Sequence, residues 1–404
     1  MARKAVLAFS GGLDTSYCVL YLREQGYEVV TVTVDTGGFT ADELTAIETR
    51  ALDLGASAHH TLDGKQALYD QMVSYIIKGN VLRGGVYPLS VGPERMIQAA
   101  EVVRIAREVG AEAVAHGSTG AGNDQVRFDV AVRTLAPELA IISPIRDQGM
   151  TRSEEAAYLQ AHGVPVDATT KAYSVNQGML GTTIGGKETK SSWGVPPDDV
   201  YPTVVPIDEA PDTPAELVIG FEAGLPVSLD GEAMEGIALM AQLDALGARH
   251  GVGKAIHLGD TIMGIKGRIA LEAPAPLILI TAHRELEKLV LTKQQAFWKN
   301  HLADVYGNLL HEGQYFDPVM RDIEALIDSS QRHVTGEAQV KMHKGSVVVT
   351  GVRSPYSLLD QAVATYGEEN VLWDGRDARG FCKIYGVQAM LAQRAAEVHN
   401  EDQS

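Results

Sequence analysis

The chain contains few cysteines and no long apolar run. Of its 404 residues only Cys18 and Cys382 are cysteines, and they are not in a Cys-x-x-Cys arrangement. A disulfide framework and a zinc knuckle are therefore excluded, and a reducing, cytoplasmic compartment is favoured. No run of about 18 apolar residues occurs, and the segment after Met1 leads directly into a strand-like run, so we expect neither a membrane span nor a signal peptide. The histidines lack the spacing of a zinc site, so no metal held by protein ligands alone is expected.

Positive charge is also scarce. Lysine and arginine number 34 against 52 aspartates and glutamates, which gives a net charge of −18. Without a basic cluster this charge argues against nucleic acid as a partner, whereas a small anionic substrate needs only a few well-placed donors. The apolar fraction of 45% is that of an ordinary globular protein, and the length exceeds one comfortable core, so we expect two domains.

Strands and helices alternate through the first half of the sequence. Apolar patterning predicts strands at 5–9, 28–34, 113–115 and 139–143, and helices at 15–25, 41–54, 87–108 and 151–161. This alternation predicts an α/β fold with a doubly wound parallel sheet. In such sheets ligands bind beyond the carboxyl ends of the strands.

In the second half of the sequence several strand-like runs occur together with helical segments, which predicts an α+β domain. Strands are expected at 216–221, 261–265, 277–281, 338–341 and 346–350, and helices at 236–250 and 294–306. Residues 386–400 predict a last amphipathic helix, which packs either on its own domain or on a neighbouring subunit. Its apolar stripe comprises Val387, Met390, Leu391, Ala395 and Val398.

Residues 8–16, Ala-Phe-Ser-Gly-Gly-Leu-Asp-Thr-Ser, join a predicted strand to a predicted helix through a glycine turn. Backbone N–H groups at such a turn, together with the helix dipole, favour an anion such as phosphate. Hydroxyls of Ser10, Thr15 and Ser16 can add donors. No Lys-Ser or Lys-Thr closes the loop, so it is not a Walker A motif. It resembles the pyrophosphate loop of the ATP pyrophosphatase superfamily, which holds the leaving pyrophosphate while AMP is transferred. The alternative is a glycine turn with a polar helix cap.

A second motif occupies residues 116–128, His-Gly-Ser-Thr-Gly-Ala-Gly-Asn-Asp-Gln-Val-Arg-Phe. Asn123 and Arg127 are four residues apart in a predicted helix, so both project from one face. An amide and a guanidinium suit an amino-acid carboxylate, and Asp124 can accept a hydrogen bond from an ammonium group. Alone, this pattern equally describes a helix cap with a surface ion pair.

The two motifs occur together with further blocks, including Tyr87-Pro88-Leu89, Ala172-Tyr173-Ser174 and Ser354-Pro355-Tyr356-Ser357-Leu358. In this order they resemble the argininosuccinate synthase family over nearly the whole chain. The resemblance implies an AMP-forming ligase of arginine biosynthesis and the urea cycle, which joins citrulline to aspartate through a citrullyl-adenylate. It also implies ATP as substrate, Mg²⁺, a cytoplasmic homotetramer, and a nucleotide-binding domain of the adenine nucleotide alpha hydrolase type. The expected division is 1–167 for nucleotide binding, 168–384 for the synthetase and oligomerisation domain, and 385–404 for the C-terminal helix.

The resemblance also assigns site residues. Asp14 and Arg127 are implied as catalytic groups; Asp14 could hold Mg²⁺ through water, and its alternative role is helix capping. Arg95 is a further carboxylate anchor. The implied ATP-binding residues are Ala8, Phe9, Ser10, Gly11, Gly12, Leu13, Asp14, Thr15, Ser16, Val34 and Gly117; those for aspartate are Thr119, Asn123 and Asp124; those for citrulline are Tyr87, Asn123, Arg127, Ser174 and Thr183.

Three positions depart from the family pattern, and all three belong to the citrulline end. Gly92 replaces a serine, Gly259 a glutamate and Leu271 a tyrosine. Losing a carboxylate matters most for a free α-ammonium, because a buried charge needs a partner. Either Asp260 takes over or the pocket is rebuilt. We expect citrulline as substrate; the alternatives are an N-acylated citrulline, another adenylating ligase or thiolase of the superfamily, or a non-catalytic ATP sensor.

Overall fold

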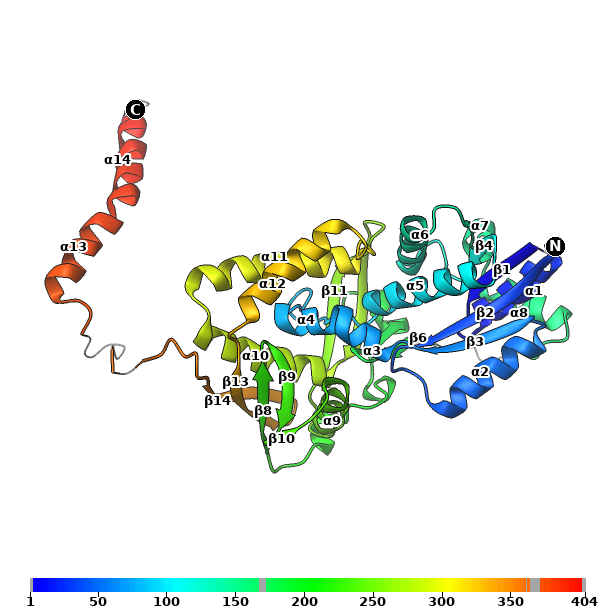
Figure 1. The fold of residues 1–404 in the computed structure, drawn as a ribbon, viewed down its shortest axis with the longest axis horizontal. Coiled ribbons are helices and arrows are strands. Elements are labelled where there is room, and N and C mark those ends of the chain that lie inside the picture. Colours follow the sequence, from blue (N-terminus) through cyan, green and yellow to red (C-terminus); the bar gives the residue numbers. More distant parts are fainter. Residues whose placement is uncertain (1–2, 167–171, 361, 364–370, 402–404) are drawn as a thin grey trace. The chain divides into compact units, whose positions relative to one another are not determined.

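The computed structural model describes residues 3–166, 172–360, 362–363 and 371–401, and the chain forms two compact units, Met1–Tyr356 and Ser357–Ser404. The first unit contains a five-stranded sheet in the order β3-β2-β1-β4-β5, in which every neighbouring pair is parallel (Figure 1). The strands are β1 Arg3–Ala8, β2 Tyr27–Asp35, β3 Ala58–Asp63, β4 Ala113–Ala115 and β5 Ala140–Ile142.

Helices cover both faces of this sheet. Val6 of β1 lies in one hydrophobic core and Leu7 in another, because successive side chains of a strand point to opposite faces. The doubly wound parallel sheet predicted from the sequence is therefore confirmed. The helices that pack in the core of Leu7 are α1 (Leu13–Glu24), α2 (Ala41–Asp53) and α8 (Arg152–Ala161), and those in the core of Val6 include α5 (Gly92–Glu108) and α6 (Asp124–Leu135).

The strand order reverses direction at β1. The chain adds β2 and β3 on one side of β1 and then returns to add β4 and β5 on the other. Such a switch point leaves a crevice beyond the carboxyl ends of the two central strands. The segments that follow β1 and β4 are residues 9–12 and 116–123, so both sequence motifs lie at this crevice.

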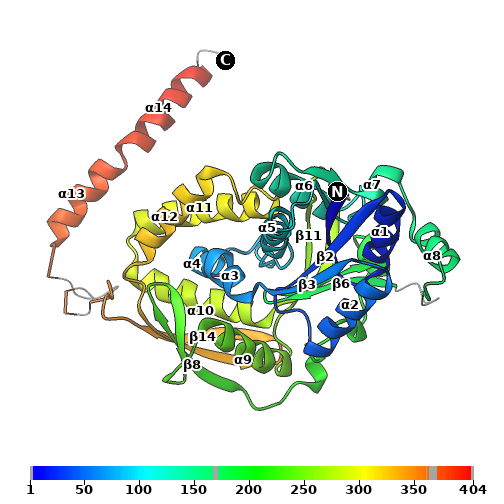
Figure 2. The same cartoon turned by 45° about the vertical axis from the view of Figure 1, so that its right-hand side comes forward.

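Two antiparallel sheets form most of the remainder of the first unit. Their orders are β10-β9-β8-β13-β14 and β11-β12-β7-β6. α10 packs against β13 and β14, and α11 and α12 lie side by side (Figure 2). The strands are β6 Tyr173–Gly178, β7 Gly181–Gly186, β8 Ala215–Glu222, β9 Leu225–Leu229, β10 Glu232–Ala233, β11 Lys254–Asp260, β12 Lys266–Glu272, β13 Gly336–His343 and β14 Ser346–Arg353.

The second half of this unit contains the further helices α9 to α12. α9 spans Gly236–Arg249, α10 Pro274–Val290, α11 Lys293–His311 and α12 Pro318–Gln331. Short helical pieces connect the strands: α3 Lys65–Leu68, the π-helical turn η1 Tyr69–Val73, α4 Ser74–Gly79, α7 Pro144–Gln148, and the 3₁₀ turns η2 Lys187–Lys190, η3 Asp198–Val200 and η4 Ile207–Glu209.

Three local predictions were wrong. The helix expected from residue 87 begins only at Gly92, because Leu89 has a φ of 63° and the chain up to Val91 is not helical. The strand expected at 261–265 is a turn, closed by the Thr261 amide that donates to the Ile265 carbonyl at 2.8 Å. The strand expected at 277–281 lies within α10, since a short buried apolar run fits a helix as well as a strand.

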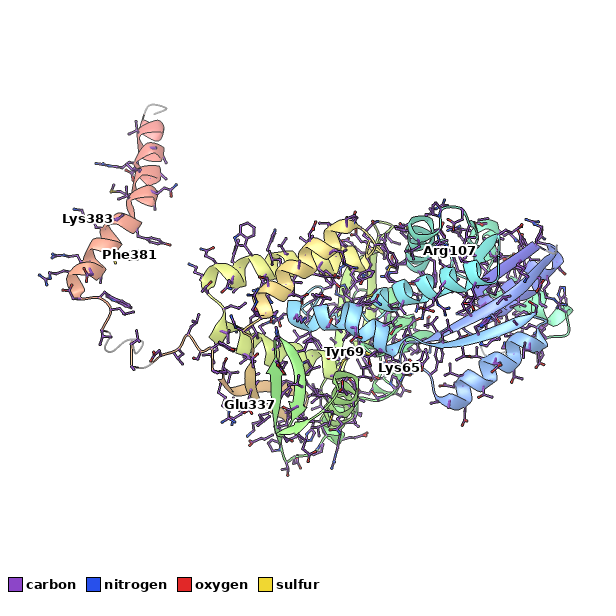
Figure 3. All side chains as sticks on the ribbon, viewed as in Figure 1. Lys65, Tyr69, Arg107, Glu337, Phe381 and Lys383 are labelled. Carbon is purple, nitrogen blue, oxygen red and sulfur yellow. The ribbon has the colours of Figure 1, made fainter. Side chains whose placement is uncertain are left out.

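The second unit contains α13 (Gly375–Tyr385) and α14 (Val387–Glu401), and the helix predicted at 386–400 is confirmed. Its apolar stripe is exposed, as is Phe381 of α13, whose side chain is labelled in Figure 3. Within the described ranges no helix combines the length and the apolarity that crossing a membrane requires.

Candidate functional site

The loop after β1 is built to expose backbone donors. Gly11 has a φ of 72°, which favours glycine, and Gly12 precedes α1 in an extended conformation. No side chain caps the N-terminus of α1, so its first N–H groups are left for an anion. The loop therefore has the form of a phosphate site.

The hydroxyls of this loop have different surroundings. Ser10 Oγ and Thr15 Oγ1 lie 3.3 Å apart at the loop itself. Ser16 is fully buried; its Oγ donates to the Gly12 carbonyl at 2.7 Å and accepts from Arg50 Nε at 2.8 Å. Ser16 thus holds the loop backbone, whereas the hydroxyls of Ser10 and Thr15 contact each other at the loop.

The end of β4 closes against the start of α1. A Cβ placed on Gly117 would lie 3.2 Å from the carbonyl carbon of Asp14 and 3.3 Å from the amide nitrogen of Thr15. Gly117 therefore meets the pyrophosphate-type loop directly. Val34, near the end of β2, is 4% exposed and packs into the core.

Asp14 makes a contact that the sequence did not predict. It lies in the first turn of α1 and is hydrogen-bonded to Glu155 of α8. Burial, together with the charge of Asp14, raises the pKa of Glu155 to about 8, so Glu155 carries a proton at neutral pH. Its Oε2 atom is buried with no hydrogen-bond partner.

Side chains fix the loop that follows β4 at three backbone positions. Ser143 Oγ donates to the Ser118 carbonyl at 3.2 Å, and Gln125 Nε2 donates to the Gly120 carbonyl at 2.6 Å. His116 Nδ1 accepts from the Ser118 amide at 3.3 Å, and its Nε2 lies 2.9 Å from Asp129. The loop that carries Gly117 and Thr119 is therefore held from both sides.

Two arginines share one carboxylate at the start of α6. Arg95 Nε and Arg127 Nη1 donate to opposite oxygens of Asp124, at 2.9 and 2.8 Å. Burial opposes the ionisation of Asp124, but the two guanidinium charges outweigh it and lower its pKa to about 2. Arg95 also reaches Asn176 of β6 at 3.0 Å. The expected carboxylate anchors Arg95 and Arg127 are thus brought together by Asp124.

Arg127 extends from Asp124 to α11. It is 3% exposed, its Nε donates to the His311 carbonyl at 3.0 Å, and its Nη2 lies 3.3 Å from His311 Nδ1. The ring of Tyr87 packs between His257, at 5.4 Å and stacked, and His311, at 6.5 Å and edge-on. Tyr87, Arg127 and these histidines therefore form one cluster of contacting side chains, called here the ureido end.

The other predicted site residues differ in their surroundings, and not all of them contact the ureido end. Asn123 Oδ1 accepts from the Ile262 amide at 2.9 Å, which ties the start of α6 to the turn between β11 and β12. The Gly122 amide donates to the Thr119 carbonyl at 3.3 Å. Thr183 is buried in β7, whereas Ser174 is an exposed residue of β6 with no side-chain hydrogen bond to the pocket in the described part of the chain.

The structure shows what surrounds each of the three positions that depart from the family pattern. A Cβ on Gly92 would lie 3.2 Å from the Leu310 carbonyl, and one on Gly259 would lie 2.6 Å from His257 Nε2. Leu271 is fully buried in the core. Asp260 does not replace the missing carboxylate, because it is largely exposed and forms an ion pair with Lys266 at 2.5 Å. His257 lies beside the position of Gly259, where a side chain would contact its ring.

Sequence reasoning missed Arg83, Glu94, Glu155, His257 and His311. Glu94 is fully buried beside Arg95, and burial raises its pKa to about 8. No periodic pattern marks any of these residues. For Glu94 the signal was its place in the turn of helix that also carries Arg95.

The fold and the glycine loop at its switch point define a doubly wound α/β protein of the class that binds nucleotides. Two family models match the chain: the argininosuccinate synthase N-terminal HUP domain over residues 4–165, and the argininosuccinate synthase C-terminal domain over residues 173–392. The chain belongs to the argininosuccinate synthase family.

Proteins named argininosuccinate synthase align over almost the full length. The one from Methanocaldococcus jannaschii is 40% identical over 393 residues, covering 97% of this chain and 98% of the relative. That from Pyrobaculum aerophilum is 41% identical over 395 residues, covering 97% and 99%. That from Xanthomonas campestris pv. campestris is 42% identical over 394 residues, covering 96% and 98%.

Proposed function

We propose that this protein is an AMP-forming ligase that joins citrulline to aspartate and cleaves ATP to AMP and pyrophosphate. One observation carries the proposal: the uncapped N-terminus of α1 and the Asp124–Arg127 pair follow the two central strands at a single switch point. A phosphate site and an amino-acid site therefore open on the same crevice. The names of the full-length relatives support this reaction over other adenylating chemistry.

The chemistry follows from the weak reactivity of a urea. Its carbon is a poor electrophile, so the ureido oxygen first attacks the α-phosphorus of ATP and pyrophosphate leaves. The product is an isourea ester of AMP. The amine of aspartate then attacks the isourea carbon, the bond to the AMP oxygen breaks, and argininosuccinate and AMP are released with one proton. The protein contributes alignment and charge stabilisation.

The resemblance of the motifs to those of the family supports the following proposed roles. The loop Ala8–Ser16 and Gly117 bind the phosphates of ATP, and the backbone at Val34 lies toward the adenosine. Thr119, Asn123 and Asp124 bind aspartate. Tyr87, Asn123, Arg127, Ser174 and Thr183 bind citrulline, with Arg95 as a further anchor that acts through Asp124.

Mg²⁺ is proposed as the ion that accompanies ATP. The described residues contain no group of three or more His, Cys, Asp or Glu side chains placed to hold a metal. This suits Mg²⁺, which binds through one or two carboxylates and substrate phosphates. Asp14, held by Glu155, would supply the carboxylate, and the ion would neutralise charge on the departing pyrophosphate.

We further propose a cytoplasmic homotetramer with the division 1–167, 168–384 and 385–404. The buried and unpaired state of Cys18 suits a reducing compartment. The exposed apolar stripe of α14 supports an assembly contact, since exposed apolar patches mark interaction surfaces.

Product analysis tests the proposed reaction. AMP, pyrophosphate and argininosuccinate should appear in equal amounts only when ATP, citrulline and aspartate are all present. Release of ADP and phosphate, or AMP formation that needs neither amino acid, would contradict the proposal. Arg104→Met is a suitable control for variants of the site, because among the described residues Arg104 forms its ion pairs with Glu101 and Glu108 on the exposed face of α5.

A further inference from the structure

Arg83 lies beside the ureido end and has no carboxylate partner among the described residues. It lies in the segment between α4 and α5, and its Nη1 donates to the Asp260 carbonyl at 3.0 Å and lies 2.9 Å from His311 Nε2. Within the part of unit Met1–Tyr356 that the structure describes, no acidic side chain lies within ion-pair distance of its guanidinium. Its Nε and Nη2 groups have no protein acceptor there. Arg83 therefore has donors left for a ligand.

His311 lies between two guanidinium groups and cannot accept a hydrogen bond from both of them. Arg83 approaches Nε2 at 2.9 Å and Arg127 approaches Nδ1 at 3.3 Å. Burial, with the charges of Arg127 and Arg83, lowers the pKa of His311 to about 3, so the ring is neutral and has a single acceptor nitrogen. One of the two arginines consequently faces an N–H group, and an anion would satisfy both.

The acidic side chains around the ureido end either have a partner already or are uncharged. Asp124 accepts from both Arg95 and Arg127, Asp260 pairs with Lys266, and burial keeps Glu94 protonated at neutral pH. Arg95 and Arg127 thus share the carboxylate of Asp124, and the carboxylate of Asp260 is bound by Lys266. His257 is neutral as well, since burial lowers its pKa. Among the described residues of the ureido end, the guanidinium groups can bind a carboxylate, and no carboxylate without a partner is left for an ammonium group.

We infer that Arg83 and Arg127, with His311 between them, bind the carboxylate of the ureido acid, and that the pocket does not select for its α-ammonium. Arg83 is then a specificity-determining residue, and the substrate class is ureido carboxylic acids. This inference rests on the proposed ligase activity. A bidentate guanidinium supplies both charge and orientation for a carboxylate, so the ureido group at the far end is aimed at the nucleotide.

The first test removes the guanidinium. Arg83→Met should raise the KM for citrulline at least tenfold and leave the KM values for ATP and aspartate within threefold, and Arg83→Lys should recover part of the loss. Arg104→Met controls for the loss of one charge and should change none of the three. Equal changes in all KM values, or no change in the KM for citrulline, would overturn the role of Arg83.

The second test uses the unaltered protein, so it does not depend on whether a variant folds. 5-Ureidopentanoate is citrulline without its amine. With ATP and aspartate fixed, its kcat/KM should lie within tenfold of that for citrulline. A loss greater than tenfold would overturn the inference while leaving the ligase intact. If neither compound yields AMP and pyrophosphate with aspartate, the proposed function itself has failed.

Discussion

The two ends of the site are constructed differently. The nucleotide end uses contiguous backbone, with Gly11, Gly12 and the first turn of α1 following β1 without interruption. The ureido end uses side chains from distant segments: Arg83 before α5, Arg127 in α6, His257 in β11 and His311 at the end of α11. Backbone donors exist in every sequence and only need the correct turn, whereas a side-chain pocket can be rebuilt one residue at a time. The difference teaches that chemistry can stay fixed at one end while selectivity is adjusted at the other.

The largest effect should come from Arg127. Arg127→Ala removes a buried guanidinium and leaves Asp124 with one partner. We expect the binding free energy of citrulline to weaken by about 3 kcal/mol. The KM for citrulline should rise about 100-fold or more, with a much smaller change for ATP. Steady-state kinetics with each substrate varied in turn measures both. Similar increases for citrulline and ATP would show that the two ends are not separable.

At the nucleotide end, two adjacent glycines provide a matched pair. Gly11→Ala places a side chain at a φ of 72° with its Cβ 3.0 Å from Ile47 Cγ1, which costs about 1–2 kcal/mol and distorts the loop. The KM for ATP should rise about tenfold. Gly12→Ala meets only Ser10 Oγ at 3.5 Å and should have little effect. Equal effects of the two variants would mean that loop conformation does not determine ATP binding.

A third prediction concerns pH. The pKa of Glu94 is raised from 4.5 to about 8 in the folded chain, mainly by burial, so the folded state binds the extra proton between these values. Its contribution to stability is complete below the unfolded pKa and is lost as pH rises through 8. The melting temperature of the wild type should therefore fall as the pH rises from 6 to 9, and that of Glu94→Gln should fall by about 3 °C less. Glu155, with a pKa of about 8, acts in the same direction and remains in both proteins.

Thermal unfolding at several pH values measures this difference. Glu101→Gln, at the surface of the same helix, serves as the control and should run parallel to the wild type. Parallel curves for Glu94→Gln would show that Glu94 is ionised in the folded chain.

The smallest effect should come from the pair His257 and Gly259. Gly259→Ala forces a Cβ to within 2.6 Å of His257 Nε2, and the stacked ring of Tyr87 limits how far His257 can move. We expect a loss of about 1 kcal/mol that falls below about 0.5 kcal/mol when His257 is alanine. Chemical denaturation of the single and double variants gives the coupling. Additive losses would mean that the glycine is not required by the histidine.

The sequence predicted the nucleotide end because its determinants are local. The apolar run, the glycine turn and the helix pattern of residues 5–25 are sufficient to place β1, the loop and α1. The ureido end was predicted only through Tyr87 and Arg127, because Arg83, His257 and His311 meet through long-range packing. At 261–265 the chain forms a turn closed by a local hydrogen bond, and at 277–281 a short apolar run that fits a strand lies within the helix α10.

The central claim is that the ureido oxygen is adenylated. Citrulline labelled with ¹⁸O in the ureido group tests it directly, because the attacking oxygen leaves with AMP. The account predicts one ¹⁸O atom in the phosphate of every AMP formed, detected by mass spectrometry. AMP that carries no label while argininosuccinate accumulates would contradict it.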